Sequence, residues 1–223
     1  MPPHDVKKLS IRLLPDGFSF LNQFYPILPG ADYAKRLEEG LLDKISESTE
    51  IQMIGQFSIE TTRFCLSPLD IDANLAQTMY ETSLPKAEQD ETVLSLEDNV
   101  HGVRFSFGID RQLYLFILRN WPDITFTHPL FELYKQQAAT DRHTQDCMIA
   151  EAEGKYLNLL VFKGDKLTLA NRFEDCGSNN NLYYIMNCWE QCGLDVLDDK
   201  LYLRTSDKNL IHNVQQYIKQ CES

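Results

Sequence analysis

The sequence predicts a mixed α/β protein made of two halves with a similar plan, and three observations lead to this prediction. Residues 147–171 contain three short apolar or alternating runs separated by glycine-containing turns, a pattern typical of a three-stranded meander. Residues 179–219 then show two helical apolar patterns with a short strand between them. Residues 1–140 open with a hairpin and also close with helix, strand and helix, so we expect a weakly repeated fold.

Length and composition favour a folded protein with a substantial core. The chain has 223 residues, of which 43% are hydrophobic and 11% aromatic, so a disordered class is disfavoured. No run of about 18 apolar residues occurs, so we expect no membrane span. The N-terminus, Met1 to Asp5, lacks the basic and apolar regions of a secretory signal. We therefore expect a cytoplasmic protein.

Charge and cysteine content restrict the partners and the metal sites that we expect. The formal net charge of −12 disfavours nucleic acid and anionic membrane surfaces, and the basic pairs Lys7–Lys8 and Lys35–Arg36 are too short to form a basic patch. Cys188 and Cys192 are four apart on a predicted helix, where a disulfide is poorly placed. No pair of cysteines gives a zinc spacing, so the six cysteines are interpreted as reduced thiols.

Local signals place the elements of the N-terminal half. A strand over residues 9–13, a turn at Pro15-Asp16-Gly17 and a strand at 18–20 predict a hairpin. Asp32 is expected to cap a helix that carries Leu37, Leu41 and Ile45. Residues 51–66 are rich in strand-forming residues, with a bulge expected at Gly55, and a helix is expected from Asp70 or Asp72 to Tyr80. A polar loop at 83–92 is followed by expected strands at 93–94 and 103–107. The half ends with a helix capped by Asp110, a strand at Phe126 and a helix opened by Pro129.

The C-terminal half begins after a polar stretch at residues 139–146. Strands are expected at 148–153, 156–162 and 167–171. The next expected elements are a helix capped within Asn179–Asn181 and ended by Gly193, a strand at 201–203, and a helix that runs from the Ser206–Asp207 cap to Ile218. The sequence therefore predicts two domains, residues 1–140 and 141–223.

Residues 9–20 (LSIRLLPDGFSF) and 181–189 (NLYYIMNCW), with Phe126-Thr127-His128 before a helix, resemble an uncharacterised family of Bacteroides-type bacterial proteins. The resemblance covers most of the chain. It implies an actin-like ATPase fold, in which two ribonuclease H-like halves face a cleft. Related architecture occurs in sugar kinases, heat-shock chaperones and actin-like adaptors of division and pilus machines. The shared motifs are structural, so the resemblance implies a fold rather than a chemistry.

The resemblance directs attention to the first turn of each half. In actin-like ATPases this turn joins an acidic residue to a glycine-rich bend, whose N–H groups approach phosphate while the carboxylate holds Mg²⁺ through water. Here the first turn has one glycine and a proline that lacks an N–H donor, and the second has one glycine beside two glutamates. We interpret both as ordinary hairpin turns. If nucleotide is bound, the candidate residues are Asp16, Gly17, Glu153, Gly154 and Lys155.

Other motifs point to structure rather than to catalysis. Asp70, Asp72 and Glu81 partly match a calcium-binding loop, but Leu75 stands where the sharp turn needs glycine, so a capped helix start is favoured. His128 before Pro129 is interpreted as a structural polar contact. We predict no catalytic and no metal-binding residues.

Two adjacent tyrosines indicate a candidate partner surface. Tyr183 and Tyr184 are adjacent on a predicted helix and point in different directions, so one of them is expected to be partly exposed. Exposed tyrosines suit protein interfaces, because they combine a large apolar ring with a polar group.

We therefore expect a non-catalytic binding or adaptor protein that holds an unknown protein partner in its cleft or at an exposed sheet edge, without a cofactor. The alternative is an enzyme, a divergent ATPase or phosphotransferase in which Asp16 and Glu153 hold Mg²⁺ beside ATP. A nuclease of the ribonuclease H type would need a two-metal carboxylate cluster, to which Glu151 and Glu153 would contribute. The acidic composition argues against that third interpretation.

Overall fold

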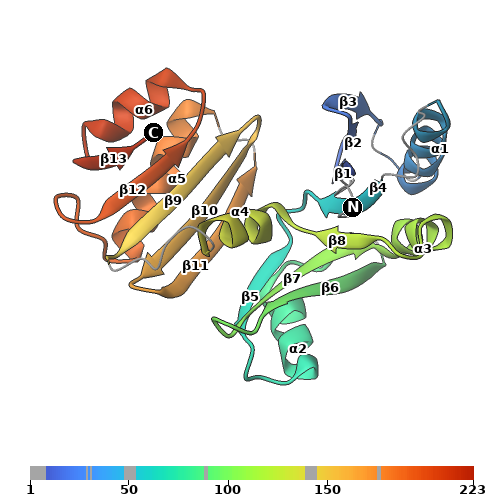
Figure 1. Cartoon of the computed structure of the whole chain (residues 1–223), viewed down its shortest axis with the longest axis horizontal. Helices are drawn as coiled ribbons and strands as arrows, with labels where there is room; N and C mark the ends of the chain where they lie inside the picture. Colours follow the sequence, from blue (N-terminus) through green and yellow to red (C-terminus); the bar gives the residue numbers. More distant parts are fainter. Residues whose placement is uncertain are drawn as a thin grey trace, which may run out of the picture. The chain divides into compact units, whose positions relative to one another are not determined.

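The computed structural model describes residues 9–28, 30, 32–47, 54–87, 90–138, 145–174 and 177–223. The chain divides into two compact units, Met1–Pro129 and Leu130–Ser223 (Figure 1). The sequence predicted a boundary after residue 140, whereas the division falls at the start of helix α4 (Pro129–Ala138), which lies mainly in the second unit. The polar stretch that suggested the later boundary lies largely outside the described residues.

The first unit is built on a five-stranded mixed sheet. Its elements are β1 (Leu9–Leu14), β2 (Gly17–Phe20), β3 (Gln23–Pro26), β4 (Ile54–Ile59), β8 (Thr125–Thr127), α1 (Tyr33–Ser46) and α3 (Arg111–Asn120). The strand order is β3-β2-β1-β4-β8, with antiparallel pairing on the β3 side of β1 and parallel pairing on the β4 side. Leu37 and Leu41 of α1 and Ile117 of α3 are buried with the apolar face of the sheet in one core.

A smaller layer is inserted between β4 and α3. It consists of β5 (Phe64–Pro68), α2 (Ala73–Ser83), β6 (Glu91–Asp98) and β7 (Val103–Asp110). The three strands form an antiparallel sheet of order β5-β7-β6. Tyr80 of α2 is fully buried, so the helix is anchored by a large aromatic side chain.

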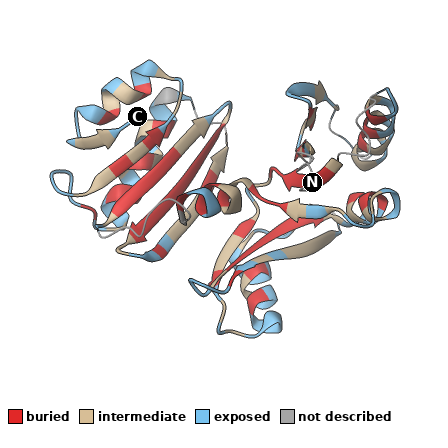
Figure 2. Ribbon diagram, in the orientation of Figure 1, coloured by how far each residue is buried: buried red, intermediate tan, exposed pale blue. Residues whose placement is uncertain are grey.

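The second unit repeats the plan of the first. Its elements after α4 are β9 (Cys147–Glu153), β10 (Tyr156–Lys163), β11 (Lys166–Glu174), α5 (Ser178–Gln191), β12 (Lys200–Arg204), α6 (Lys208–Gln215) and β13 (Gln220–Glu222). The central strands of this sheet are almost continuously buried (Figure 2). Their apolar side chains form a core with Ile185 and Trp189 of α5 and with Leu210 and Val214 of α6.

The internal repeat is visible in the two sheet topologies. The second sheet has the order β11-β10-β9-β12-β13, which matches β3-β2-β1-β4-β8 position by position. The pairing directions also match, and one helix precedes the fourth strand and another precedes the fifth in each unit. The predicted α/β class with mixed sheets and two related halves is therefore confirmed.

Several local predictions are confirmed and others are wrong. The register shifts between Leu9 and Ser10, whose partners are Ile54 and Gln56, so Gly55 is indeed a bulge. The short edge strands β3 and β13 were not predicted. Helix α6 ends at Gln215, because residues 216–219 turn before β13 instead of continuing the helix.

The helix starts show which capping predictions hold. Asp72, Asp110 and Asp207 accept backbone N–H groups in the first turn of α2, α3 and α6. Asp32 stands at the start of α1 but its side chain makes no cap hydrogen bond. The expected cap within Asn179–Asn181 is wrong, because the N-cap of α5 is Gly177, two to four residues earlier.

None of the helices in the described ranges is both long and apolar enough to cross a membrane.

Candidate functional site

The first candidate turn, at the end of β1, is a tight hairpin. Leu14 pairs with Gly17, so Pro15 and Asp16 form a two-residue turn, and the Asp16 carbonyl accepts the N–H of Ile27 at 2.8 Å. Gly17 has a φ of +153°, and a Cβ there would lie 2.2 Å from the carbonyl oxygen of Tyr25 in β3. The close approach of β3 is thus a sufficient reason for glycine at this position.

The second candidate turn, at the end of β9, occupies the equivalent place in the second unit. Glu153 pairs with Tyr156, so Gly154 and Lys155 form the turn, and Gly154 has a φ of +57°. The Lys155 ammonium lies 2.8 Å from the Glu174 carboxylate and 5.4 Å from the centre of the Tyr156 ring. Lys155 is therefore held by its own sheet in this conformation.

Neighbouring polar groups of the second sheet form a row across three strands. The Asn158 side-chain amide donates to Glu151 at 3.1 Å, and Arg172 donates to the Asn158 side-chain oxygen at 2.6 Å. The Arg172 guanidinium also stacks over Tyr156, 3.9 Å from the ring centre. Glu151, a candidate in the nuclease interpretation, is thus engaged in a cross-strand network.

His128 and Asp72 make the structural contacts that the sequence predicted for them. His128 is fully buried between Phe64 and Phe107, and its Nε2 lies 2.9 Å from the Thr61 carbonyl oxygen, so it makes a structural contact. Asp72 accepts the N–H of Leu75 at 2.9 Å, as a helix cap does. In the part of the chain that the structure describes, no three His, Cys, Asp or Glu side chains are grouped as a metal site.

An ion-paired cluster that the sequence did not reveal joins α2 to β6. The Arg63 guanidinium donates to both carboxylate oxygens of Glu91 at 2.9 and 3.0 Å and to the Pro85 carbonyl at 2.6 Å. Tyr80 donates to the same carboxylate at 3.0 Å. Burial, followed by the nearby Glu91 charge, raises the pKa of Tyr80. Cavities of about 620 and 520 Å³ adjoin this cluster, whose groups satisfy one another.

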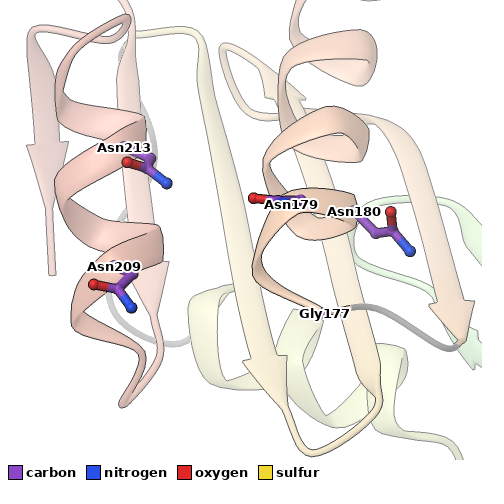
Figure 3. Close-up of a pocket in the computed structure, with 5 residues that line it drawn as sticks. All are labelled: Gly177, Asn179, Asn180, Asn209 and Asn213. Atoms are coloured by element: carbon purple, nitrogen blue, oxygen red, sulfur yellow. The ribbon is translucent and has the colours of Figure 1, made fainter.

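The side of α5 next to α6 forms a cleft lined by amides. It is lined by Gly177, Asn179, Asn180, Asn209 and Asn213 and has a volume of about 580 Å³. Figure 3 shows Asn179 directed toward α6 and Asn213 directed toward α5, whereas Asn180 lies on the other side of its helix. The cleft offers neutral hydrogen-bonding groups at the N-terminal end of α5.

An apolar cavity on α5, which we term the α5 groove, has a volume of about 640 Å³. It is lined by Asn179, Leu182, Tyr183, Met186, Asn187, Trp189, Glu190, Leu194, Val196 and Tyr217. Trp189 is only 1% exposed and forms a rigid part of the wall, whereas Tyr183 and Tyr217 are 63% and 55% exposed. Large apolar side chains exposed around a cavity are typical of a surface that binds a partner.

The helical register of α5 explains why the groove forms. Tyr184 turns inward and stacks on Phe173 with ring centres 4.1 Å apart, while Tyr183 turns outward. Leu182 and Met186 are four residues apart, so they lie on the same face of α5, and both line the groove. The expectation that one of the two tyrosines is exposed is confirmed. The sequence did not predict the contribution of Val196, whose loop after α5 has no regular pattern, or of Tyr217, which the fold brings beside α5 from the end of α6.

Comparison with known proteins places the chain in a structural context. The model of a family described as "Protein of unknown function (DUF3822)" matches residues 56–221. The chain is similar to a Bacteroides thetaiotaomicron VPI-5482 protein with an actin-like ATPase fold and unknown function, with 25% identity, a TM-score of 0.79, and coverage of 96% of this chain and 89% of that chain. The predicted resemblance and the actin-like ATPase fold are therefore confirmed.

A second solved structure shares the fold at lower similarity. It is the PilM–PilN type IV pilus biogenesis complex, with 12% identity, a TM-score of 0.54, and coverage of 96% of this chain and 86% of that chain. A search of functionally curated proteins gives no significant match.

Proposed function

We propose that this chain, which belongs to the DUF3822 family of proteins of unknown function, is a binding or adaptor protein that holds a segment of a partner protein in the α5 groove. The observation that carries the proposal is the exposure of Tyr183 and Tyr217 beside an apolar cavity with a rigid tryptophan wall. Tyrosine and tryptophan dominate the binding energy of many protein interfaces.

The dimensions of the groove support this function. Its volume of about 640 Å³ accommodates several apolar side chains of a partner. Burying one apolar side chain of leucine size contributes roughly 1.5–3 kcal/mol, so two or three anchors would offset a substantial part of the entropy lost on association. Most of the wall residues lie on α5, and Trp189 and Leu194 are buried, which lowers the entropy that binding would cost.

The pilus complex supports a protein as the class of partner. It is a complex of two proteins, PilM and PilN, and it shares the fold of this chain. A sequence identity of 12% supports a shared fold and no more. The partner of this chain and the place where it binds are therefore proposed from the α5 groove.

The divergent ATPase remains the alternative proposal, with Asp16, Gly17, Glu153, Gly154 and Lys155 as its binding residues. Two observations favour the binding role over it. Gly17 is accounted for by the approach of Tyr25, and Lys155 is paired with Glu174, so neither residue needs a nucleotide to explain it. The net charge of −12 would also repel the phosphates of a nucleotide.

A matched pair of surface variants tests the proposed function. Tyr183→Asp puts a charge at the mouth of the groove, and Leu115→Asp makes the same change at a half-exposed site on α3 in the other unit. Proteins retained by the wild-type chain would be purified and titrated against both variants by calorimetry. We expect Tyr183→Asp to weaken binding at least tenfold and Leu115→Asp to leave it unchanged. Equal affinity for both variants would exclude the groove as the binding site.

A further inference from the structure

We infer that the segment held in the α5 groove is a basic amphipathic helix that lies antiparallel to α5. This inference rests on the proposed function and adds the chemistry and direction of the partner. It is carried by the distribution of charge around the groove, by the polarity of α5 along the groove, and by the kind of wall that the groove presents.

The residues around the α5 groove give it a negative charge. Glu190 is the charged residue among the described residues that line it. The loop that follows α5 adds the exposed carboxylates of Asp195 and Asp198, on either side of Val196 and Leu197. An apolar floor with carboxylates at its margin complements a helix with an apolar stripe flanked by lysine or arginine.

Basic residues near this margin do not cancel its charge. The Lys163 ammonium lies 2.9 Å from the Asp146 carboxylate and donates to the Gly193 carbonyl at 3.1 Å, so its charge is already paired. Lys219 is exposed, and its backbone N–H binds the Val196 carbonyl at 3.0 Å. Among the described residues named here, the exposed lysine Lys219 thus stands against the three carboxylates of Glu190, Asp195 and Asp198.

The two ends of the groove differ in polarity, which gives the partner a direction. Asn179 lies at the N-terminal end of α5, beside the neutral amide cleft, whereas Glu190 lies at its C-terminal end. The C-terminus of a helix carries a partial negative charge and the N-terminus a partial positive charge. A partner helix therefore binds best with its positive N-terminal end, and its basic side chains, over Glu190 and Asp198.

The length of the groove sets the length of the partner. Asn179 and Glu190 are separated by roughly 16 Å along a helix that rises 1.5 Å per residue. About three helical turns of a partner would span this distance, with apolar anchors at positions i, i+3 or i+4, and i+7.

Other occupants fit the groove less well. A second copy of this chain would bring the same acidic margin against Glu190 and Asp198. An added β-strand needs an unpaired strand edge, and no strand contributes to the described lining of the groove. Nucleic acid would meet carboxylates instead of a basic patch.

The test uses displayed helical peptides of about 14 residues, long enough for three to four turns, with randomised apolar and flanking positions. Peptides are selected on the full chain and titrated against a Trp121→Phe form, in which Trp189 is the one remaining tryptophan and reports occupancy of the groove by fluorescence. We expect peptides whose binding is lost with Tyr183→Asp to carry lysine or arginine in their N-terminal halves.

Charge reversal provides the matched comparison. Glu190→Lys with Asp198→Lys should weaken the selected peptides about tenfold at low salt, because attraction to the basic side chains becomes repulsion and low salt screens it little. Glu39→Lys with Glu81→Lys makes the same net change at exposed sites in the first unit and should leave affinity unchanged. Moving the basic residues to the C-terminal half of a peptide should also weaken it.

The outcomes separate the two proposals. Groove-dependent peptides with neutral or acidic flanks would overturn the basic partner and leave the proposed function standing. Equal affinity after the basic residues are moved would overturn the antiparallel direction. Failure to select any peptide whose binding depends on Tyr183 would contradict both the inference and the proposed function.

Discussion

Gly17 and Gly154 occupy equivalent turns in the two units but are glycine for different physical reasons. At Gly17 a Cβ would lie 2.2 Å from the Tyr25 carbonyl oxygen, whereas at Gly154 no atom beyond the two neighbouring residues lies within 4 Å of the Cβ position. Gly154 needs only a φ of +57°, which costs other residues roughly 1–2 kcal/mol. The first glycine reflects the packing of β3, and the second reflects turn geometry alone.

Alanine substitutions at the two turns should therefore differ in cost. We expect Gly154→Ala to lower the free energy of unfolding by about 1 kcal/mol. Gly17→Ala adds overpacking against a backbone atom and should cost about 3 kcal/mol or more. Urea unfolding of the two variants measures both values, and equal costs would contradict the role assigned to Tyr25.

The ionisation of the single residue Tyr80 gives a prediction for how stability depends on pH. Its pKa is raised from 10.0, first by burial and then by the Glu91 carboxylate. Above pH 10 the unfolded chain therefore loses this proton before the folded chain does, and stability falls as pH rises. Between pH 10 and pH 11 the free energy of unfolding should fall more steeply for the wild type than for Tyr80→Phe. Parallel curves would show that Tyr80 ionises normally in the folded state.

At the scale of single elements, capping separates helix α2 from helix α1. Asp72 accepts the N–H of Leu75 at 2.9 Å, whereas Asp32 makes no side-chain cap bond. Asp72→Ala should cost about 1 kcal/mol of stability and Asp32→Ala only a few tenths. Chemical denaturation of both variants checks the difference. A larger loss for Asp32→Ala would show that Asp32 does cap α1 in solution.

The elements that the sequence predicted are those with a strong local signal. Apolar periodicity located most helices and long strands, such as β10 and α3. The strand β3 was missed because its turn, Leu21-Asn22, has positive φ values of 51° and 62° without a glycine to mark it. The start of α5 was misplaced because three consecutive asparagines are good capping residues, and Gly177 was passed over.

The candidate site was predictable only in part, because local sequence patterns do not show which distant segments pack together. Helix geometry predicts that one of Tyr183 and Tyr184 is exposed, and the structure shows that the exposed one is Tyr183. The groove also needs Val196, from the loop that follows α5, and Tyr217, which is far from α5 in sequence and follows α6. The pairs Arg63–Glu91 and Lys155–Glu174 likewise depend on strand register, which local patterns do not encode.

At the scale of the whole molecule, the repeated sheet order and the comparisons establish an actin-like ATPase fold, and a fold of this kind hosts many functions. The binding role predicts that nucleotide does not stabilise the chain. A ligand at about 100 times its dissociation constant adds roughly 2.7 kcal/mol, or several degrees of melting temperature for a chain of this size. We expect no rise with millimolar Mg²⁺–ATP or Mg²⁺–ADP. A rise that is lost in Asp16→Ala with Glu153→Ala would instead support the ATPase.

The most direct measurement of the central claim is site-specific photo-crosslinking in the cells that make the protein. A photoreactive amino acid would replace Tyr183 in the α5 groove and, as the control, Leu115 on α3, since both side chains are at least half exposed. The binding role predicts a discrete protein adduct from position 183 that is absent from position 115. No adduct at position 183, or the same adducts at both positions, would contradict a partner held in the α5 groove.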